Sequence, residues 1–528
     1  MDEFIAKYQD HIQGVLCGFD RLVFRGHLRA LSFAGGMNQY LASNRILLKN
    51  FAAHMTAVNQ QLKTASLAEA AASERPVEYL ALAQIDKEKR ARAIAARDGV
   101  QQGLVCVFKT LEVCQSFQIH RNPQTRHLEL QSCWRKCLFL YHYWMHPQLG
   151  FLHARIQTWF PFAIQVCLNG REWLARQMDR RGLEYARQDN CFPWVGDWKQ
   201  AQELLERQRR TNWAPCLDRL ARQLNPAHEQ IFRKFQVHYY WSVYQSEWAS
   251  DVVFRNPGFL RRLVPRLLHH DLTTLGSRQV MHFLGRRVNL SGAIPKKFAG
   301  QLRSDLRERQ EGTRLKHTIN GNSVKLYDKA YTPLGSVLRA ETTVNNEADF
   351  RVYRPREGDP QGAKSWRLLR RGIADLYRRT EVSQCANERY LDALAAVDDD
   401  TTLEELLAGL QQPRLWKGRR VRALRPFQDD QVLLATVSRG AFTINGFRNR
   451  DLQAQFFPTP TDDDRERARR SAWVTRRLRL LRAHSLIRKI SGTHRYQLTS
   501  AGRRAITAIL TALHATVRQL TPTLAMAA

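Results

Sequence analysis

The sequence has no apolar run long enough to cross a bilayer. The longest such run, WFPFAIQVCL at positions 159–168, is half of the roughly 20 residues that a membrane-spanning helix needs. The first residues, MDEFIAKYQDHIQG, lack the apolar core of a secretory signal peptide. Cysteines number only nine and are scattered, which is typical of a chain whose thiols stay reduced. These absences predict a cytoplasmic protein with no membrane partner.

Motifs of several common enzyme classes are also missing. The chain contains no Walker loop, no dinucleotide-binding fingerprint and no serine-centred nucleophile elbow. An NTPase, a redox enzyme and a serine hydrolase therefore lose support, and we expect no nucleotide cofactor.

Acidic residues are scarce relative to basic ones. There are 49 Asp and Glu against 82 Lys and Arg, a formal net charge of +33 with an isoelectric point near 10.3. An excess of this size favours a polyanionic partner. The basic residues are spread along the chain and do not form one amphipathic anchor, which favours nucleic acid over an anionic membrane. DNA is the preferred partner and structured RNA the second; a basic metabolic enzyme from an arginine-rich genome is the alternative.

The order of helical and extended patterns predicts an α+β fold. We expect an antiparallel-sheet platform with helical insertions and a C-terminal winged helix-turn-helix. The predicted domains are an N-terminal α+β domain at 1–225, a central domain at 226–410 and a winged-helix nucleic-acid-binding domain at 411–528. The central domain contains a basic β-hairpin segment at 312–346 and long helices, one of them over HYYWSVYQSEWASDVVF at 238–254. The sequence leaves the oligomeric state open.

The C-terminal end is strongly basic, with 17 Lys and Arg against 5 Asp and Glu over residues 439–528. A helix over roughly 471–484 would bury Val474, Leu478 and Leu481, which recur at helical spacing. Its arginines would then face outward toward a major groove, and basic residues of the following hairpin would flank phosphates or the minor groove. The candidate nucleic-acid-binding residues here are Arg476, Arg477, Arg479, Arg482, Arg488, Lys489, His494 and Arg495. A winged helix that contacts another protein is the alternative.

The segment GTRLKHTINGNSVKLYDKAYTPLGSVLRAETTVNN, positions 312–346, predicts three antiparallel strands. A two-residue turn at Asn320-Gly321 sets the register of the first two strands. The resulting polar face holds Arg314, Lys316, Lys325, Tyr327, Lys329, Arg339 and Glu341. Lys316 lies directly opposite Lys325, and such a pair destabilises a sheet unless an anion such as phosphate lies on it. Arg314, Lys316 and Lys325 are therefore candidate nucleic-acid-binding residues.

Tyr327 lies among cations on this face, which would favour its phenolate and attack on phosphorus. Glu341 could help to hold a divalent metal ion, Mg²⁺ or Mn²⁺. The strands SVKLYDK and VLRAETTVNN resemble the Y-[DN]-K and R-x-E strand pair of rolling-circle replication initiators of plasmids and phages. The resemblance implies Tyr327 as the nucleophile, Glu341 as a metal or water partner, and Lys329 and Arg339 as phosphate ligands. The His-hydrophobe-His metal motif of those initiators is missing, and a Tyr327 that stacks a base or covers the sheet is the alternative.

Two further carboxylates, Glu247 and Asp251, fall at positions i and i+4 of the helix expected over 238–254. On one helix face they would repel each other unless a cation lies between them, which makes them candidate metal ligands. Pairing with arginines is the alternative. Asp20, in GFDRLVFRGHL, is either a member of a buried ion pair or an acid of the site, and the sequence does not decide between these roles.

Longer stretches of the chain carry a second resemblance. GVLCGFDRLVFRG, RIQTWFPFAIQVCLNGREWLARQ and GFRNRDL are similar to a widespread bacterial family of mobile-element-like proteins, a resemblance that implies no particular activity. The combined hypothesis is a nucleic-acid-binding protein of a mobile element that acts in replication initiation or transposition through tyrosine-dependent, metal-assisted DNA nicking. The alternative is a non-catalytic DNA- or RNA-binding protein that recognises a structured element.

Overall fold

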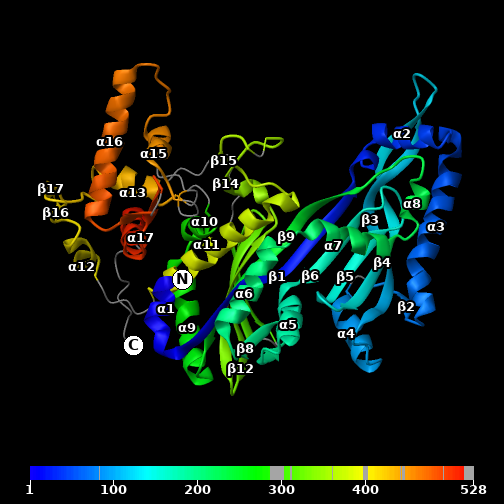
Figure 1. Ribbon diagram of the computed structural model, residues 1–528, viewed down its shortest axis with the longest axis horizontal. Coiled ribbons are helices and arrows are strands. Elements are labelled where there is room, and N and C mark those ends of the chain that lie inside the picture. The colour runs from blue at the N-terminus through cyan, green and yellow to red at the C-terminus, as the bar shows by residue number, and fades with distance from the viewer. Residues whose placement is uncertain are drawn as a thin grey trace, which may run out of the picture. The chain divides into compact units, whose positions relative to one another are not determined.

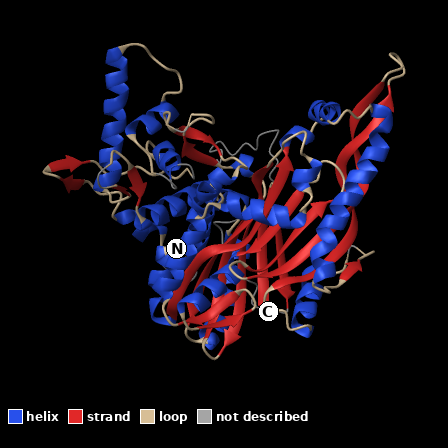
Figure 2. Cartoon of the chain, turned by 45° about the vertical axis from the view of Figure 1, so that its right-hand side comes forward, coloured by secondary structure: helices blue, strands red, loops and turns tan. Residues whose placement is uncertain are grey.

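The computed structural model of the chain describes residues 1–82, 84–285, 302–309, 312–359, 361–396, 402–439, 442, 446–490 and 493–515. The fold is α+β, as predicted: one large sheet combines with helices and with small two-stranded hairpins (Figures 1 and 2). None of the helices in these residue ranges has both the length and the apolar character needed to cross a membrane.

The large sheet has eleven strands in the described part of the chain. In spatial order they are β10 (Arg303–Arg309), β11 (Gly312–Ile319), β12 (Asn322–Thr332), β13 (Gly335–Val344), β9 (Tyr239–Phe254), β1 (Ile12–Leu28), β6 (Ile164–Asn169), β5 (Gly150–Gln157), β4 (Leu128–His146), β3 (Gly103–Arg121) and β2 (Val77–Tyr79). The pairs from β10 to β13 and from β1 through β6, β5 and β4 to β3 are antiparallel, whereas β2 joins β3 in parallel.

The chain divides into two compact units that are each discontinuous in sequence. Unit 1 consists of residues 1–15, 249–370 and 378–528, and unit 2 of residues 16–248 and 371–377. Strands β1 and β9 each contribute residues to both units. The three domain ranges expected from the sequence, 1–225, 226–410 and 411–528, stay a prediction.

In unit 1, one face of β11, β12 and β13 is apolar and carries the main core. Side chains such as Val324, Leu326 and Leu338 are buried there against helices. The helices that contribute to this core are α1 (Asp2–Tyr8), α9 (Pro257–Thr274), α10 (Ser277–Phe283) and α11 (Leu376–Leu394). Because strand side chains alternate, Lys325, Tyr327 and Lys329 project from the opposite, polar face, up to a bulge between Lys329 and Tyr331.

The C-terminal part of unit 1 has its own apolar core, and Figure 1 shows its helices grouped together. Its elements are α12 (Leu403–Ala408), α13 (Gln431–Val437), α15 (Asn449–Phe456), α16 (Asp464–Ala483), α17 (Ser500–His514), and the hairpins β16 (Arg414–Trp416) with β17 (Arg419–Val421) and β18 (Ile487–Lys489) with β19 (Tyr496–Leu498). Val474, Leu478 and Leu481 are buried, as predicted from their spacing. A further hairpin, β14 (Arg351–Arg354) with β15 (Ser365–Leu368), precedes this part.

In unit 2, helices and a small hairpin flank the strands β1 and β3 to β6. The helices are α2 (Ala34–Ser43), α3 (Phe51–Ala72), α4 (Lys87–Arg97), α5 (Gly170–Arg181), α6 (Trp198–Arg210), α7 (Trp213–Leu224) and α8 (His228–Ile231), and the hairpin is β7 (Tyr185–Gln188) with β8 (Cys191–Val195). Leu16 of β1 packs into one core with α5, α6 and β8. Gly182 ends α5 with a φ of +62°, a left-handed conformation that glycine adopts without strain.

The register predicted for the basic hairpin is confirmed. Arg314 pairs with Tyr327 and Lys316 with Lys325, and β13 then places Arg339 opposite Tyr327. The turn residues Asn320 and Gly321 both have positive φ, +49° and +81°, as a type I′ hairpin turn requires.

The helix predicted over 238–254 is wrong. Tyr239–Phe254 form the strand β9, whose second half is buried almost without interruption. Tyr, Trp and Val are typical strand residues, and a strand covered on both faces loses the alternation that distinguishes it from a buried helix. Glu247 and Asp251 therefore lie about 13 Å apart along a strand, at roughly 3.3 Å per residue, and cannot bind the same ion.

A buried histidine in unit 2 predicts a specific loss of stability in acid. His142 of β4 is fully buried and donates a hydrogen bond from Nε2 to the carbonyl oxygen of Ser66 at 2.9 Å. Burial lowers the pKa of His142 to about 4. The unfolded chain binds this proton near pH 6.5, so the free energy of unfolding should fall by about 3 kcal/mol between pH 7 and pH 4.

Urea unfolding at pH 7 and at pH 4 measures this loss. Replacing His142 with Leu removes the titrating ring, and the variant should lose correspondingly less stability on acidification than the natural protein. An equal loss in both proteins would show that other groups cause the acid sensitivity.

Candidate metal centre

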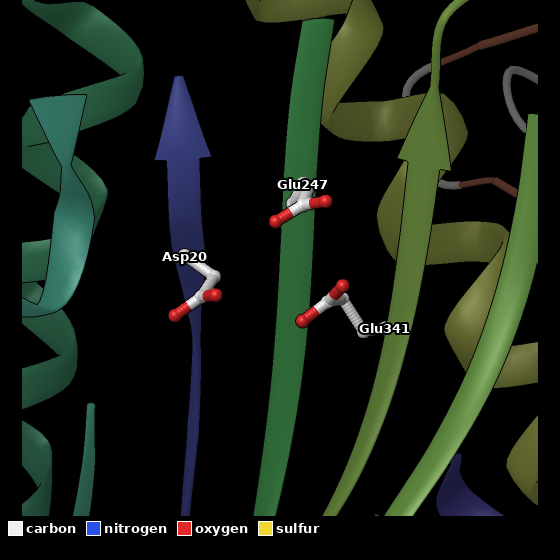
Figure 3. Close-up of side chains that lie close together, drawn as sticks. All are labelled: Asp20, Glu247 and Glu341. Carbon is white, nitrogen blue, oxygen red and sulfur yellow. The ribbon is translucent and has the colours of Figure 1, made fainter. Parts of the chain in front are cut away.

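Three carboxylates converge on adjacent strands of the large sheet. Asp20 lies on β1, Glu247 on β9 and Glu341 on β13, and one carboxylate oxygen of each lies within 4.8 Å of the others (Figure 3). Asp20 is 8% exposed and Glu341 only 2%, while the side chain of Glu247 is 13% exposed. Like charges this close and this buried repel strongly unless cations are present.

Asp20 is held by the hairpin β7–β8 of unit 2. The Nδ2 atom of Asn190, in the turn of this hairpin, donates a hydrogen bond to Oδ1 of Asp20 at 2.7 Å. The preceding residue in β1 is fixed by Gly170, the first residue of α5: a Cβ at Gly170 would lie 2.0 Å from the carbonyl oxygen of Phe19. A larger residue at position 170 would thus displace the backbone that carries Asp20.

Glu247 and Glu341 each have a nearby cation. Nε of Arg21 is 4.0 Å from Oε2 of Glu247, and Nε2 of Gln245 donates to Oε1 at 3.0 Å. Nζ of Lys325 donates to Oε1 of Glu341 at 2.5 Å, and both side chains are buried. Lys325, which the sequence predicts to contact a phosphate, therefore lies against the carboxylate of Glu341.

The donor set fits a hard divalent cation. Mg²⁺ and Mn²⁺ bind oxygen ligands, and Mg²⁺ takes them at 2.0–2.1 Å. Two oxygens bound to one such ion can be at most about 4.2 Å apart, so small side-chain movements would bring all three carboxylates to one ion. Asp20, Glu247 and Glu341 are the residues that would hold it, and Asn190 and Lys325 would orient two of them.

Tyr327 lies next to this cluster on β12. It faces Arg339, and its diagonal neighbour on β13 is Glu341, at a separation of about 7–8 Å between such positions. Tyr327 is half-buried, and Nζ of Lys329 lies 5.5 Å from the centre of its ring. Arg314 opposite Tyr327 donates from Nη2 to Oδ2 of Asp305 at 3.0 Å, while Lys316 is half-buried.

Arg339 makes a bidentate ion pair inside unit 1. Its Nε donates to Oδ1 of Asp251 at 2.5 Å and its Nη2 to Oδ2 at 2.9 Å, and both side chains are buried. The guanidinium that the sequence assigns to a phosphate is thus directed at a protein carboxylate. Of the two acids on β9, Glu247 belongs to the cluster of three, and Asp251 is the partner of Arg339.

The basic residues of the C-terminal part lie at its surface. Arg476, Arg488, Lys489 and His494 are exposed, and Arg477, Arg479, Arg482 and Arg495 are half-buried. Aromatic rings hold several of these guanidinium groups: Cζ of Arg477 lies 3.2 Å from the ring centre of Trp473, and that of Arg495 4.6 Å from the ring centre of Tyr353.

The sequence left the role of Asp20 open and gave no role to Asn190. Nothing in the local sequence links positions 20, 247 and 341, because only the pairing of β13, β9 and β1 brings them together. One signal was present: Asp20 is the single carboxylate in the otherwise apolar and basic stretch GFDRLVFRGHL. Comparison with protein-family models, curated proteins and solved structures found no match to this chain.

Proposed function

We propose that this protein is a metal-dependent nucleic-acid-processing enzyme that cleaves, and can rejoin, a phosphodiester bond. The observation that carries the proposal is the cluster of Asp20, Glu247 and Glu341, whose oxygens lie within 4.8 Å of one another in a chain with a net charge of +33. Many enzymes that cleave phosphodiester bonds use carboxylates to bind a divalent ion. The excess of Lys and Arg side chains would attract the nucleic-acid backbone.

Stacked arginine–tyrosine pairs near the cluster support a nucleic-acid substrate. On β9, the exposed rings of Tyr240 and Tyr244 are covered by Arg29 and Arg25, with Cζ at 3.4 Å and 4.6 Å from the ring centres. An exposed ring beside a guanidinium offers a base a stacking surface and a phosphate a cation. These pairs would bind a nucleic-acid strand and direct it toward Glu247, which lies three residues after Tyr244 on β9.

The C-terminal part of unit 1 is proposed to be a winged helix. The order α13, α15, α16 and the hairpin β18–β19 has the form of three helices followed by a wing, and α16 buries Val474 and Leu478 while its arginines lie outside. This module would supply most of the sequence-independent affinity through phosphate contacts.

The proposed reaction uses Tyr327 as the nucleophile. Its phenol oxygen forms a bond to phosphorus, the bond from phosphorus to one sugar oxygen breaks, and the phenol proton ends on the released sugar oxygen. The products are a phosphotyrosyl link and a strand end with a free hydroxyl, and reversal rejoins the strand. A bound divalent ion would polarise the phosphate and stabilise charge on the leaving oxygen.

The test is to incubate the protein with end-labelled single-stranded and hairpin DNA in the presence of Mg²⁺ or Mn²⁺, or of a chelator. We expect cleavage only with the metal and a protein–DNA adduct that survives SDS. Tyr327→Phe should lose the adduct completely and keep the affinity for DNA, because only the hydroxyl is removed. Cleavage without an adduct would assign the attack to water and remove Tyr327 from the reaction, and no cleavage of any substrate would overturn the proposal.

A second candidate function is non-catalytic recognition of a structured DNA or RNA element. The arginine–aromatic stacks of the C-terminal part favour it, since they need no metal. In either case we propose a cytoplasmic protein that serves replication initiation or transposition of a mobile element, and terminal repeats or a structured RNA beside the gene would identify the substrate.

A further inference from the structure

The C-terminal part of unit 1 contains a cavity of about 570 Å³. Such a volume is within the range of pockets that hold small organic ligands. The hairpin β16–β17, the start of α15, the C-terminal half of α16 and β19 contribute to its wall. It is therefore a pocket between neighbouring elements of one module and is separate from the three carboxylates.

The wall of this cavity is strongly cationic. Arg448, Arg450, Arg479, Arg482 and His494 line it, and no carboxylate does so among the described residues. Nε of Arg448 is buried and donates a hydrogen bond to no acceptor among the residues that the structure describes. A buried guanidinium donor without an acceptor is costly, and a bound anion would supply one.

Two aromatic rings complete the cavity. Trp416 and Tyr496 both line it, and Arg482 lies near both rings, with Cζ at 4.8 Å from the first ring centre and 5.8 Å from the second. Trp416 is only half-buried, on a short hairpin whose neighbouring Leu415 is 78% exposed. Aromatic surface next to arginines in one pocket matches a ligand with a flat ring and a phosphate.

We propose that this cavity binds one unpaired nucleotide of a single strand, with the base against Trp416 and the adjacent phosphate on Arg479 and Arg482. A base in a duplex is stacked between its neighbours and cannot enter, so the pocket would select single-stranded or extruded nucleotides. The inference rests on one part of the proposed function, that the protein binds nucleic acid. It does not depend on the metal centre.

The test measures binding of the full chain by fluorescence anisotropy in a chelator, which prevents cleavage. The probes are fluorescein-labelled oligothymidylate, an abasic strand of the same length and charge, and a paired duplex. Trp416→Leu should weaken oligothymidylate binding roughly tenfold, as expected for loss of one stacked base, and should leave the abasic strand and the duplex unchanged. Trp416→Phe should restore most of the affinity.

The arginines have a matched control on the same helix. Arg479→Gln should lower the affinity for both single strands and reduce the slope of log affinity against log salt by about 1. Arg467→Gln removes the same charge 12 residues earlier in α16, about 18 Å along the helix, where the side chain is 60% exposed and pairs with Asp464. This control should preserve the preference for oligothymidylate over the abasic strand.

The outcomes separate this inference from the proposed function. Equal affinity of the natural protein and Trp416→Leu for oligothymidylate would overturn the nucleotide pocket and leave the metal centre untouched. Trp416-dependent binding by a protein that cleaves nothing would support the pocket and overturn the proposed reaction. Absence of binding to every probe would overturn both.

Discussion

Asp20→Asn is expected to reduce metal-dependent DNA cleavage by about 10³-fold. The substitution keeps the size of the side chain and the Oδ1 atom that accepts from Asn190, and it removes one of the three charges that would hold the cation. A bound divalent ion contributes several kcal/mol to phosphodiester cleavage, and each 1.36 kcal/mol corresponds to a factor of about ten in rate. Initial rates on end-labelled DNA at saturating Mg²⁺ or Mn²⁺ provide the measurement.

Metal binding can be measured without catalysis. A ligand that binds only the folded protein raises its stability by about 2.7 kcal/mol at a concentration of 100 Kd. The natural protein should therefore melt at a higher temperature in Mn²⁺ than in chelator, and Asp20→Asn should lose most of that increase. Mn²⁺ is a suitable probe because carboxylate sites for Mg²⁺ generally accept it.

The neighbourhood of Asp20 offers a control. Asp189 is exposed, lies directly before Asn190, and has a φ of +50°, a conformation that asparagine tolerates well. Asp189→Asn thus removes one carboxylate charge close by in the fold, and it should leave both cleavage and the melting increase in Mn²⁺ unchanged. If Asp20→Asn cleaves DNA at the natural rate, the three carboxylates are not the catalytic centre.

The basic hairpin shows what local sequence determines well. The Asn320-Gly321 turn sets the pairing of β11 with β12, and a slip of one residue would exchange the buried Leu326 with the polar Tyr327. Turn chemistry and strand alternation therefore agree on one register. Alternation along the next strand also predicted correctly that Glu341 shares a face with Lys325 and Tyr327.

The candidate metal centre depends on information that no local pattern carries. A spacing of four residues between Glu247 and Asp251 puts them on one face of a helix and equally on one face of a strand, since four is an even number. Burial on both faces of β9 removed the alternation that would have decided between the two. The proximity of Asp20 to Glu247 and Glu341 follows from pairing between strands far apart in the sequence, which only the assembled sheet shows.

Arg339→Met is expected to lower the free energy of unfolding by about 3–5 kcal/mol. Methionine fills a similar volume, but Asp251 would lose the guanidinium that now donates two hydrogen bonds to it in a fully buried position. Removing one member of a buried ion pair costs this much because the remaining charge stays out of water without its partner. Chemical unfolding followed by circular dichroism measures the difference.

Three further variants separate the structural role of Arg339 from phosphate binding. The double variant Arg339→Met with Asp251→Leu should recover most of the lost stability, since two apolar side chains replace the pair. Arg307→Met, on β10, removes an arginine that is 60% exposed and pairs with Asp305, and it should change stability by less than about 0.5 kcal/mol. Asp251→Asn alone should be destabilising, because a neutral amide then faces the buried guanidinium. A contradicting result would be an Arg339→Met variant that is as stable as the natural protein but has lost its affinity for DNA. Arg339 would then contact the phosphate backbone, as the resemblance to replication initiators implies, and the ion pair with Asp251 would not stabilise the fold.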